Sequence, residues 1–126
     1  MKNLTIAASL TLAGTIALGV AVYAQPAANA DPVKVDPKHY KVEFENESVR
    51  VLRISYAPGE KSVMHHHPNS VAVYLTDGMA RMSTPDGKSE EIPFKAGVTA
   101  WTPAGTHLPQ NIGNKPFQVL LVEMKK

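Results

Sequence analysis

Three consecutive histidines, His65, His66 and His67, stand shortly before the apolar segment VAVYL and are the residues of this chain best suited to chemistry. In an extended strand, residues two positions apart point to the same face. His65 and His67 therefore share one face, whereas His66 points to the other. Two imidazoles on one face can hold a single metal ion between them.

A third imidazole would have to come from another part of the chain, where the candidates are His39 and His107. His39 precedes the first expected strand, whereas His107 directly follows the tight turn at 103–106. Because a turn that closes a β-sandwich can return the chain beside the first pair, the sequence favours His107. Three neutral imidazoles suit zinc, copper, iron or nickel and leave coordination positions open for water or substrate. The pattern is typical of a reactive metal centre and not of a closed structural one.

The same residues also have a simpler interpretation. The HHHP segment can be the polar end of a hairpin that binds no ion, and His107 can be a loop residue that is hydrogen-bonded to the backbone. Spacing alone leaves both interpretations open. No other chemistry competes with a metal, because the sequence has no glycine-rich phosphate loop, no Gly-x-Ser-x-Gly, no Asp-rich calcium loop and no plausible Ser-His-Asp set.

Methionine and aromatic side chains in short strands more often fill a core than line a binding pocket. We assign this role to Met64, Met79, Met82, Tyr74 and Trp101. An arginine turned into the interior would be a natural anchor for a carboxylate substrate. The candidates are Arg50, Arg53 and Arg81, and alternation does not show which of them turns inward.

Length and composition limit the function classes. The 126 residues allow one domain. Thirteen Lys plus Arg against 11 Asp plus Glu give a net charge of +2, which lacks the basic excess expected of a nucleic-acid-binding protein. Cysteine is absent, which excludes disulfides, thiolate metal ligands and thiol nucleophiles. Any metal must therefore be held by histidine, carboxylate or amide groups.

After the N-terminal region, short apolar runs alternate with turn signals, and no stretch of ten residues keeps a helical period. This pattern predicts an all-β sandwich or barrel. The segment TPDGK at 84–88 predicts a tight hairpin turn, and the last run, FQVLLVEM, predicts a central strand that is covered on both faces. The expected strands are 40–45, Val49–Tyr56, Val71–Leu75, Met79–Thr84, Lys88–Ile92, Val98–Thr102 and Phe117–Met124.

The N-terminus has the pattern of a secretory signal peptide. Residues 4–24 carry no charge, follow Lys2 and end in small residues that suit a signal peptidase. Cleavage fits after Ala24 or after Ala30. We expect a signal peptide and cleavage region at 1–30, a linker at 31–38 and a folded domain at 39–126 that is periplasmic or secreted. The alternative is an uncleaved anchor, because about 20 apolar residues would span a bilayer.

Two segments resemble the paired motifs of the cupin superfamily. The segment at 59–78, GEKSVMHHHPNSVAVYLTDG, is similar to the first motif, and the segment at 97–111, GVTAWTPAGTHLPQN, is similar to the second. The resemblance implies a small single-domain cupin, whose fold is a double-stranded β-helix or jelly-roll barrel with a metal site inside. The matching residues are Gly59, His65, His67 and Gly78 in the first motif, and Gly97, Pro103, Gly105, His107 and Asn111 in the second.

The chain departs from the family pattern at two points. Val71 stands at the usual glutamate position of the first motif, so the carboxylate ligand is missing. In the second motif a single residue separates Gly105 from His107, where the family usually has two. A shortened loop keeps His107 at the ligand position, and otherwise Leu108 would occupy it. The remaining three-histidine set resembles, in ligand type alone, the iron centres of thiol dioxygenases, and the lost carboxylate favours an anionic ligand or O₂.

Two functions are consistent with this resemblance. The first is an exported cupin that binds one divalent transition metal ion (Fe, Mn, Zn, Cu or Ni) through His65, His67 and His107. Its barrel would bind a small molecule, with dioxygenase and isomerase chemistry both open. The second is a non-enzymatic module that binds a small ligand or a partner protein without metal. Neither involves nucleic acid or stable membrane insertion after cleavage. The resemblance also implies a homodimer that pairs through sheet edges.

The signal peptide makes a testable prediction. Mass spectrometry of the exported protein is expected to show a chain that starts near Gln25 or Asp31, because signal peptidase cuts after small residues. An intact Met1 in the membrane fraction would instead identify residues 4–24 as an anchor.

Overall fold

The computed structural model describes residue 19 and residues 29–126, so nearly all of the expected signal segment lies outside the described residues. The described part has one short helix, α1 (Pro32–Val35), followed by strands only. The strands are β1 (Tyr40–Glu45), β2 (Val49–Tyr56), β3 (His65–His67), β4 (Ser70–Tyr74), β5 (Gly78–Ser83), β6 (Ser89–Phe94), β7 (Thr99–Thr102), β8 (Gly105–Asn111) and β9 (Phe117–Met124).

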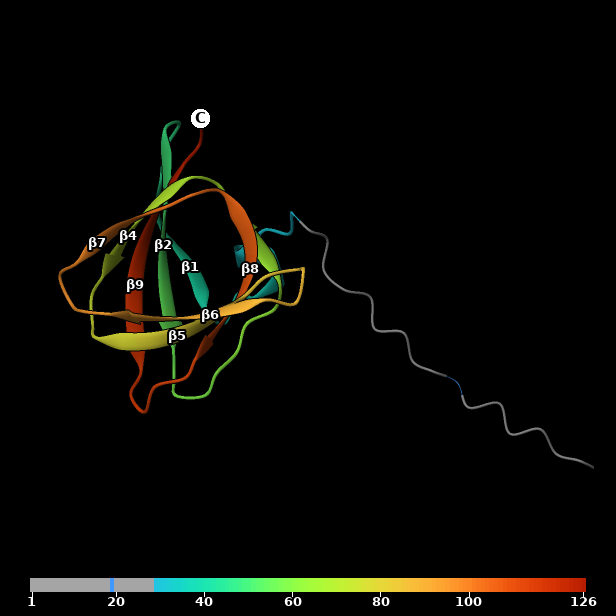
Figure 1. Cartoon of the computed structure of the whole chain (residues 1–126). Helices are drawn as coiled ribbons and strands as arrows, with labels where there is room; N and C mark the ends of the chain where they lie inside the picture. The colour runs from blue at the N-terminus through green and yellow to red at the C-terminus, as the bar shows by residue number, and fades with distance from the viewer. Residues whose placement is uncertain (1–18, 20–28) are drawn as a thin grey trace, which may run out of the picture.

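The strands form two antiparallel sheets that wrap around a common interior (Figure 1). The larger sheet has the order β1-β2-β9-β4-β7, and the smaller has the order β3-β8-β5-β6. From β3 to β9 the chain crosses between the sheets at every step except the β5–β6 hairpin, as in a double-stranded β-helix. The all-β jelly-roll prediction is confirmed.

Strand β9 shows how the alternation of side chains builds the core. Phe117, Val119, Leu121 and Glu123 point inward and are buried, while the residues between them are half-buried on the outer face. The prediction of a central position is confirmed, because β9 lies between β2 and β4. The residues on its outer face are half-buried, so this face is less covered than the inner one.

Two strands, β3 and β8, carry the histidines of the cluster, and neither is among the strands that the sequence predicts. The sequence predicts a turn and a loop after residue 102, but Gly105–Asn111 forms β8 between β3 and β5. The sequence pattern does not predict this strand, because it contains Gly105 and Pro109, and both residue types are uncommon inside sheets. The hairpin predicted at 84–88 is confirmed. Gly87 has a φ of +83°, and its N–H donates to the carbonyl of Thr84 at 3.0 Å.

The segment at 31–38, predicted to be a linker, is attached to the barrel. Asp31 caps α1 by accepting a hydrogen bond from the N–H of Val33, and Pro32 starts the helix, where its missing N–H costs nothing. The carbonyl of Ala30 accepts a hydrogen bond of 2.9 Å from the backbone N–H of His66. The chain ahead of β1 therefore touches the strand that carries two of the candidate ligands. Within residue 19 and residues 29–126, no helix is long and apolar enough to cross a membrane.

Candidate metal centre

The register of two strands brings the three predicted histidines together. β3 pairs with β8 so that His65 lies directly opposite His107. His67 shares the face of His65, as the two-residue period of a strand requires. Each of the three residues offers one ring nitrogen, and these nitrogens all lie within 4.8 Å of one another. Of the two candidates for the third imidazole, the fold selects His107.

The cluster is buried and its rings are packed edge to face. The exposed fraction of His65 is 0% and that of His67 is 2%, while His107 is half-buried. The ring centroid of His107 lies 5.0 Å from that of His65 and 5.2 Å from that of His67. The Nε2 atoms of His65 and His67 are 3.0 Å apart. These distances leave the three rings facing one small volume.

The outer nitrogens of two rings are held by groups that can only accept a hydrogen bond. His65 Nδ1 donates to the backbone carbonyl of Val63 at 2.8 Å, and His67 Nδ1 donates to a carboxylate oxygen of Glu123 at 2.7 Å. A neutral imidazole has one N–H, so both Nε2 atoms are left with bare lone pairs. Two lone pairs that face each other at 3.0 Å repel unless a proton or a cation lies between them. The donor set therefore fits a metal ion that prefers imidazole nitrogen.

Glu123 is the functional residue that the sequence analysis missed. Its side chain is 2% exposed, and each carboxylate oxygen has a partner: Oε1 accepts from His67, and Oε2 accepts from Arg50 Nε at 2.7 Å. Arg50 is held in turn by two hydrogen bonds to Asp31, of 3.0 and 3.1 Å. Burial acts to raise the pKa of Glu123, but the hydrogen bonds from His67 and Arg50 outweigh it, so the pKa lies below its usual value.

Two other residues of the sequence analysis lie away from the cluster. His39 is buried on the far side of Tyr56, where it stacks on that ring at 4.2 Å. Its ring nitrogens contact the carboxylates of Asp36 and Glu60. His66 points away from His65, as predicted, and its Nδ1 lies 3.1 Å from the hydroxyl of Thr106.

Val71 does not face the cluster. It pairs with Val122 on β9 and Trp101 on β7, on the outer face of the larger sheet. The inward residue at this level is Ala72, which lines the interior cavity. A carboxylate at position 71 would therefore point away from the cluster, whereas one at position 72 would point into the cavity. Neither residue supplies a ligand, so the nearest carboxylate to the cluster is Glu123, which contacts His67 from behind.

Burial keeps two of the histidines neutral. Burial, together with the nearby His67, lowers the pKa of His65 to about 4 and that of His107 to about 3. Neutral imidazole is the form that binds a metal.

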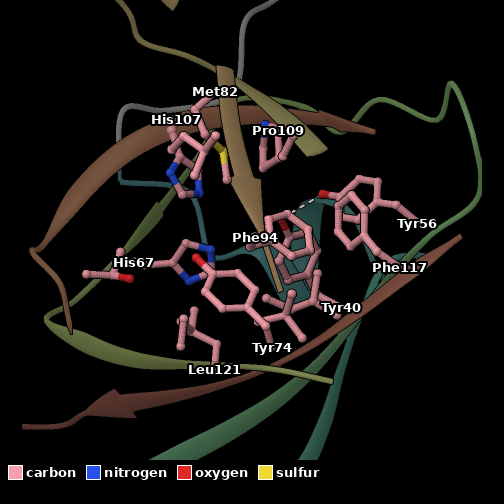
Figure 2. Close-up of a pocket in the computed structure, with 16 residues that line it drawn as sticks. Tyr40, Tyr56, His67, Tyr74, Met82, Phe94, His107, Pro109, Phe117 and Leu121 are labelled. Carbon is pink, nitrogen blue, oxygen red and sulfur yellow. Dashed lines mark hydrogen bonds between the residues drawn. The ribbon is translucent and has the colours of Figure 1, made fainter. Parts of the chain in front are cut away.

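The barrel interior holds a cavity beside the cluster. Its volume is about 80 Å³, and His67 and His107 form part of its wall. Figure 2 shows these two rings reaching into the cavity from different strands, and Tyr74 and Phe94 also line it. Tyr40 and Tyr56 also line the cavity, and their phenol oxygens are 2.7 Å apart (Figure 2). A metal ion on the histidines would therefore have space for a ligand on its cavity side.

Comparison with known proteins agrees with this architecture. The model of the cupin domain family matches residues 52–123, which is more than half of the chain. The chain belongs to the cupin family. No curated protein matches this cupin in sequence. A cupin domain from Bordetella pertussis Tohama I is similar in structure, with 26% identity, a TM-score of 0.64, and coverage of 82% of this chain and 99% of that one.

Two further solved structures are similar to this cupin. A conserved protein with a double-stranded β-helix domain from Klebsiella pneumoniae has 26% identity, a TM-score of 0.53, and coverage of 67% of this chain and 74% of its own. An RmlC-like cupin family protein from Methanocaldococcus jannaschii has 19% identity, a TM-score of 0.53, and coverage of 71% and 83%. The last likeness shows the fold alone.

The low pKa values of His65 and His107 predict how the metal-free protein responds to pH. Between pH 6.5 and about 5, the unfolded chain binds protons at these histidines, whose ordinary pKa is 6.5, while the folded chain does not. The free energy of unfolding is therefore expected to decrease as the pH falls through this range. Urea denaturation at several pH values should show about two extra protons bound on unfolding, and about one in His107→Gln. An identical pH dependence in the variant would contradict the assignment.

Proposed function

We propose that this cupin is exported and binds one divalent transition metal ion through His65, His67 and His107. The observation that carries the proposal is the pair of facing Nε2 atoms, 3.0 Å apart, whose rings both donate from Nδ1 to acceptors. A closed structural zinc site would need a fourth protein ligand. Among the described residues, the group able to hold a metal contains these three histidines alone. The remaining coordination positions would be open to water or to a small molecule.

The chain's own residues support such an ion in two ways. Hydrogen bonds from Nδ1 to the Val63 carbonyl and to Glu123 fix the ring orientations and leave the correct nitrogen free. The carboxylate of Glu123 also makes the His67 ring a better electron donor. Its charge is shared with Arg50, which limits how strongly it acts on the ring.

The cavity next to His67 and His107 is the proposed binding place of the small molecule. A metal there would supply Lewis acidity or a binding centre for O₂, which fits isomerase and dioxygenase chemistry. The alternative is a metal-free module that uses the same cavity for a small ligand. The homodimer expected from the sequence stays a prediction.

Metal content tests the proposal directly. Elemental analysis of the untagged domain is expected to find about one equivalent of Fe, Mn, Cu, Ni or Zn, and the double variant His65→Ala/His107→Ala should lose it. His66→Ala is the matched control, because its ring points away from the cluster and the variant should keep the metal. If the wild-type protein and the double variant both remain metal-free after loading, the three-histidine centre is wrong and the metal-free module is favoured.

Glu123 offers a second test, since it touches His67 and not the ion. Glu123→Gln keeps the size of the side chain but removes the charge that holds the His67 ring. We expect the affinity for the metal to fall by roughly 10- to 100-fold, as is usual when the hydrogen-bond partner of a ligand is lost. Competition with a chelating dye would measure it, with circular dichroism as a check on folding. Glu43→Gln, which breaks an exposed ion pair with Arg53, should leave the affinity unchanged. Equal affinities in both variants would refute the role of Glu123.

A further inference from the structure

The wall of the interior cavity carries no charged side chain. Apart from His67 and His107, its described lining consists of aliphatic and aromatic residues, one methionine, one proline and one threonine. The polar groups within this wall are the hydroxyls of Tyr40, Tyr56, Tyr74 and Thr102. The first two are 2.7 Å apart and hydrogen-bond to each other, which reduces what they can offer a ligand.

The arginines that the sequence left open do not enter this cavity. Arg50 pairs with Asp31 and Glu123, Arg53 pairs with Glu43, and Arg81 pairs with Glu91. None of the three lines the cavity. A second carboxylate on a bound molecule would therefore find no cationic partner away from the metal, and burying an unpaired charge is costly.

The cavity would not stabilise a positively charged group of a ligand either. Five aromatic rings line the cavity, and aromatic faces can attract cations. However, the rings of Tyr74 and Phe94 stack on each other with their centroids 4.4 Å apart. Phe94 and Phe117 pack edge to face with their centroids 5.1 Å apart. Because these rings pack against one another, little of their faces is left to contact a cation. A divalent ion on the histidines would also repel any ammonium group nearby.

The size of the cavity sets a second limit. Its volume of about 80 Å³ is well below the roughly 300 Å³ at which drug-sized pockets begin. Phe94 and Phe117 close one side, and both are buried in the core cluster. The cavity therefore suits a short chain or a small branched group.

From these observations we infer the substrate class of the proposed metal site: a short organic molecule with one metal-binding end, anionic or neutral, and an uncharged apolar remainder. The inference rests on the proposed function, because the metal is the charge partner of the binding end. It excludes amino acids, dicarboxylates and sugars, whose additional charges or hydroxyls would lie unpaired against the apolar wall.

A matched pair of small ligands tests the inference. Butyrate and β-alanine have the same number of non-hydrogen atoms and differ in one group, since an ammonium replaces the terminal methyl. The cobalt(II)-loaded protein is titrated with each at neutral pH and followed by its visible absorption. We expect the apparent dissociation constant of butyrate to be at least tenfold lower than that of β-alanine.

A charge placed on the cavity wall should change this preference. Ile92 lines the cavity from the edge strand β6 and is half-buried, so a carboxylate there can keep contact with water. Ile92→Glu is expected to reduce the preference for butyrate at least fivefold, because it gives the ammonium a partner. Ile92→Gln has the same shape without the charge and should keep the wild-type preference within about twofold.

The possible outcomes distinguish a failure of the inferred substrate class from a failure of the proposed metal site. A histidine-dependent cobalt spectrum with equal or tighter binding of β-alanine would overturn the substrate class and leave the metal site standing. The same holds if Ile92→Gln changes the preference as much as Ile92→Glu does. If no cobalt spectrum depends on His65 and His107, both the proposed metal site and the substrate class fail.

Discussion

A buried negative charge in the barrel wall controls the geometry of the histidine cluster. Glu123 lies on the central strand of the larger sheet and is 2% exposed, so its charge must be compensated within the protein. Arg50 compensates it from one side and His67 from the other. Because His67 must donate from Nδ1, its Nε2 is turned toward His65 with a bare lone pair. The tautomer of His67 follows from that hydrogen bond, and the tautomer of His65 follows from its own bond to the Val63 carbonyl.

A second network supports the cluster from the opposite side. The hydroxyl of Ser62 donates to Asp36 at 2.5 Å and lies 3.4 Å from His65 Nδ1. Asp36 also accepts a hydrogen bond from His39, which stacks on Tyr56. Residues that seemed unrelated in the sequence thus support the two buried histidines from both sides. Such support is what a site needs to hold its ligands in one arrangement.

Much of the fold was predictable because strand alternation and turn chemistry are local. The central position of β9 and the 84–88 hairpin follow from residue types within a few positions. Strand β8 was not predictable, because Gly105 and Pro109 have turn-like preferences, and pairing with β3 and β5 overrides them. The paired residues are 25 to 42 positions apart in the chain, and no local pattern indicates such pairing.

The candidate site was predictable in its ligands but not in their support. The spacing of His65 and His67 and the motif around His107 identified the three imidazoles. The alternation of side chains along β9 could have identified Glu123, because Glu123 follows Phe117, Val119 and Leu121 on the inward face. A lone acid at a core position of a strand is rare enough to mark a functional role. The same alternation along β4 turns Ala72 toward the cavity and Val71 toward the outer face.

The attachment of the N-terminal segment bears on where this domain begins. The family match covers residues 52–123, yet Arg50 and Asp31 lie ahead of it, and so do Asp36 and His39. A chain cut at the family boundary would keep every imidazole of the cluster and lose the groups that neutralise Glu123 and brace Ser62. The region that the family model matches is therefore shorter than the region that supplies the groups supporting the cluster. In this protein the hydrogen-bond network behind the cluster reaches back to Asp31.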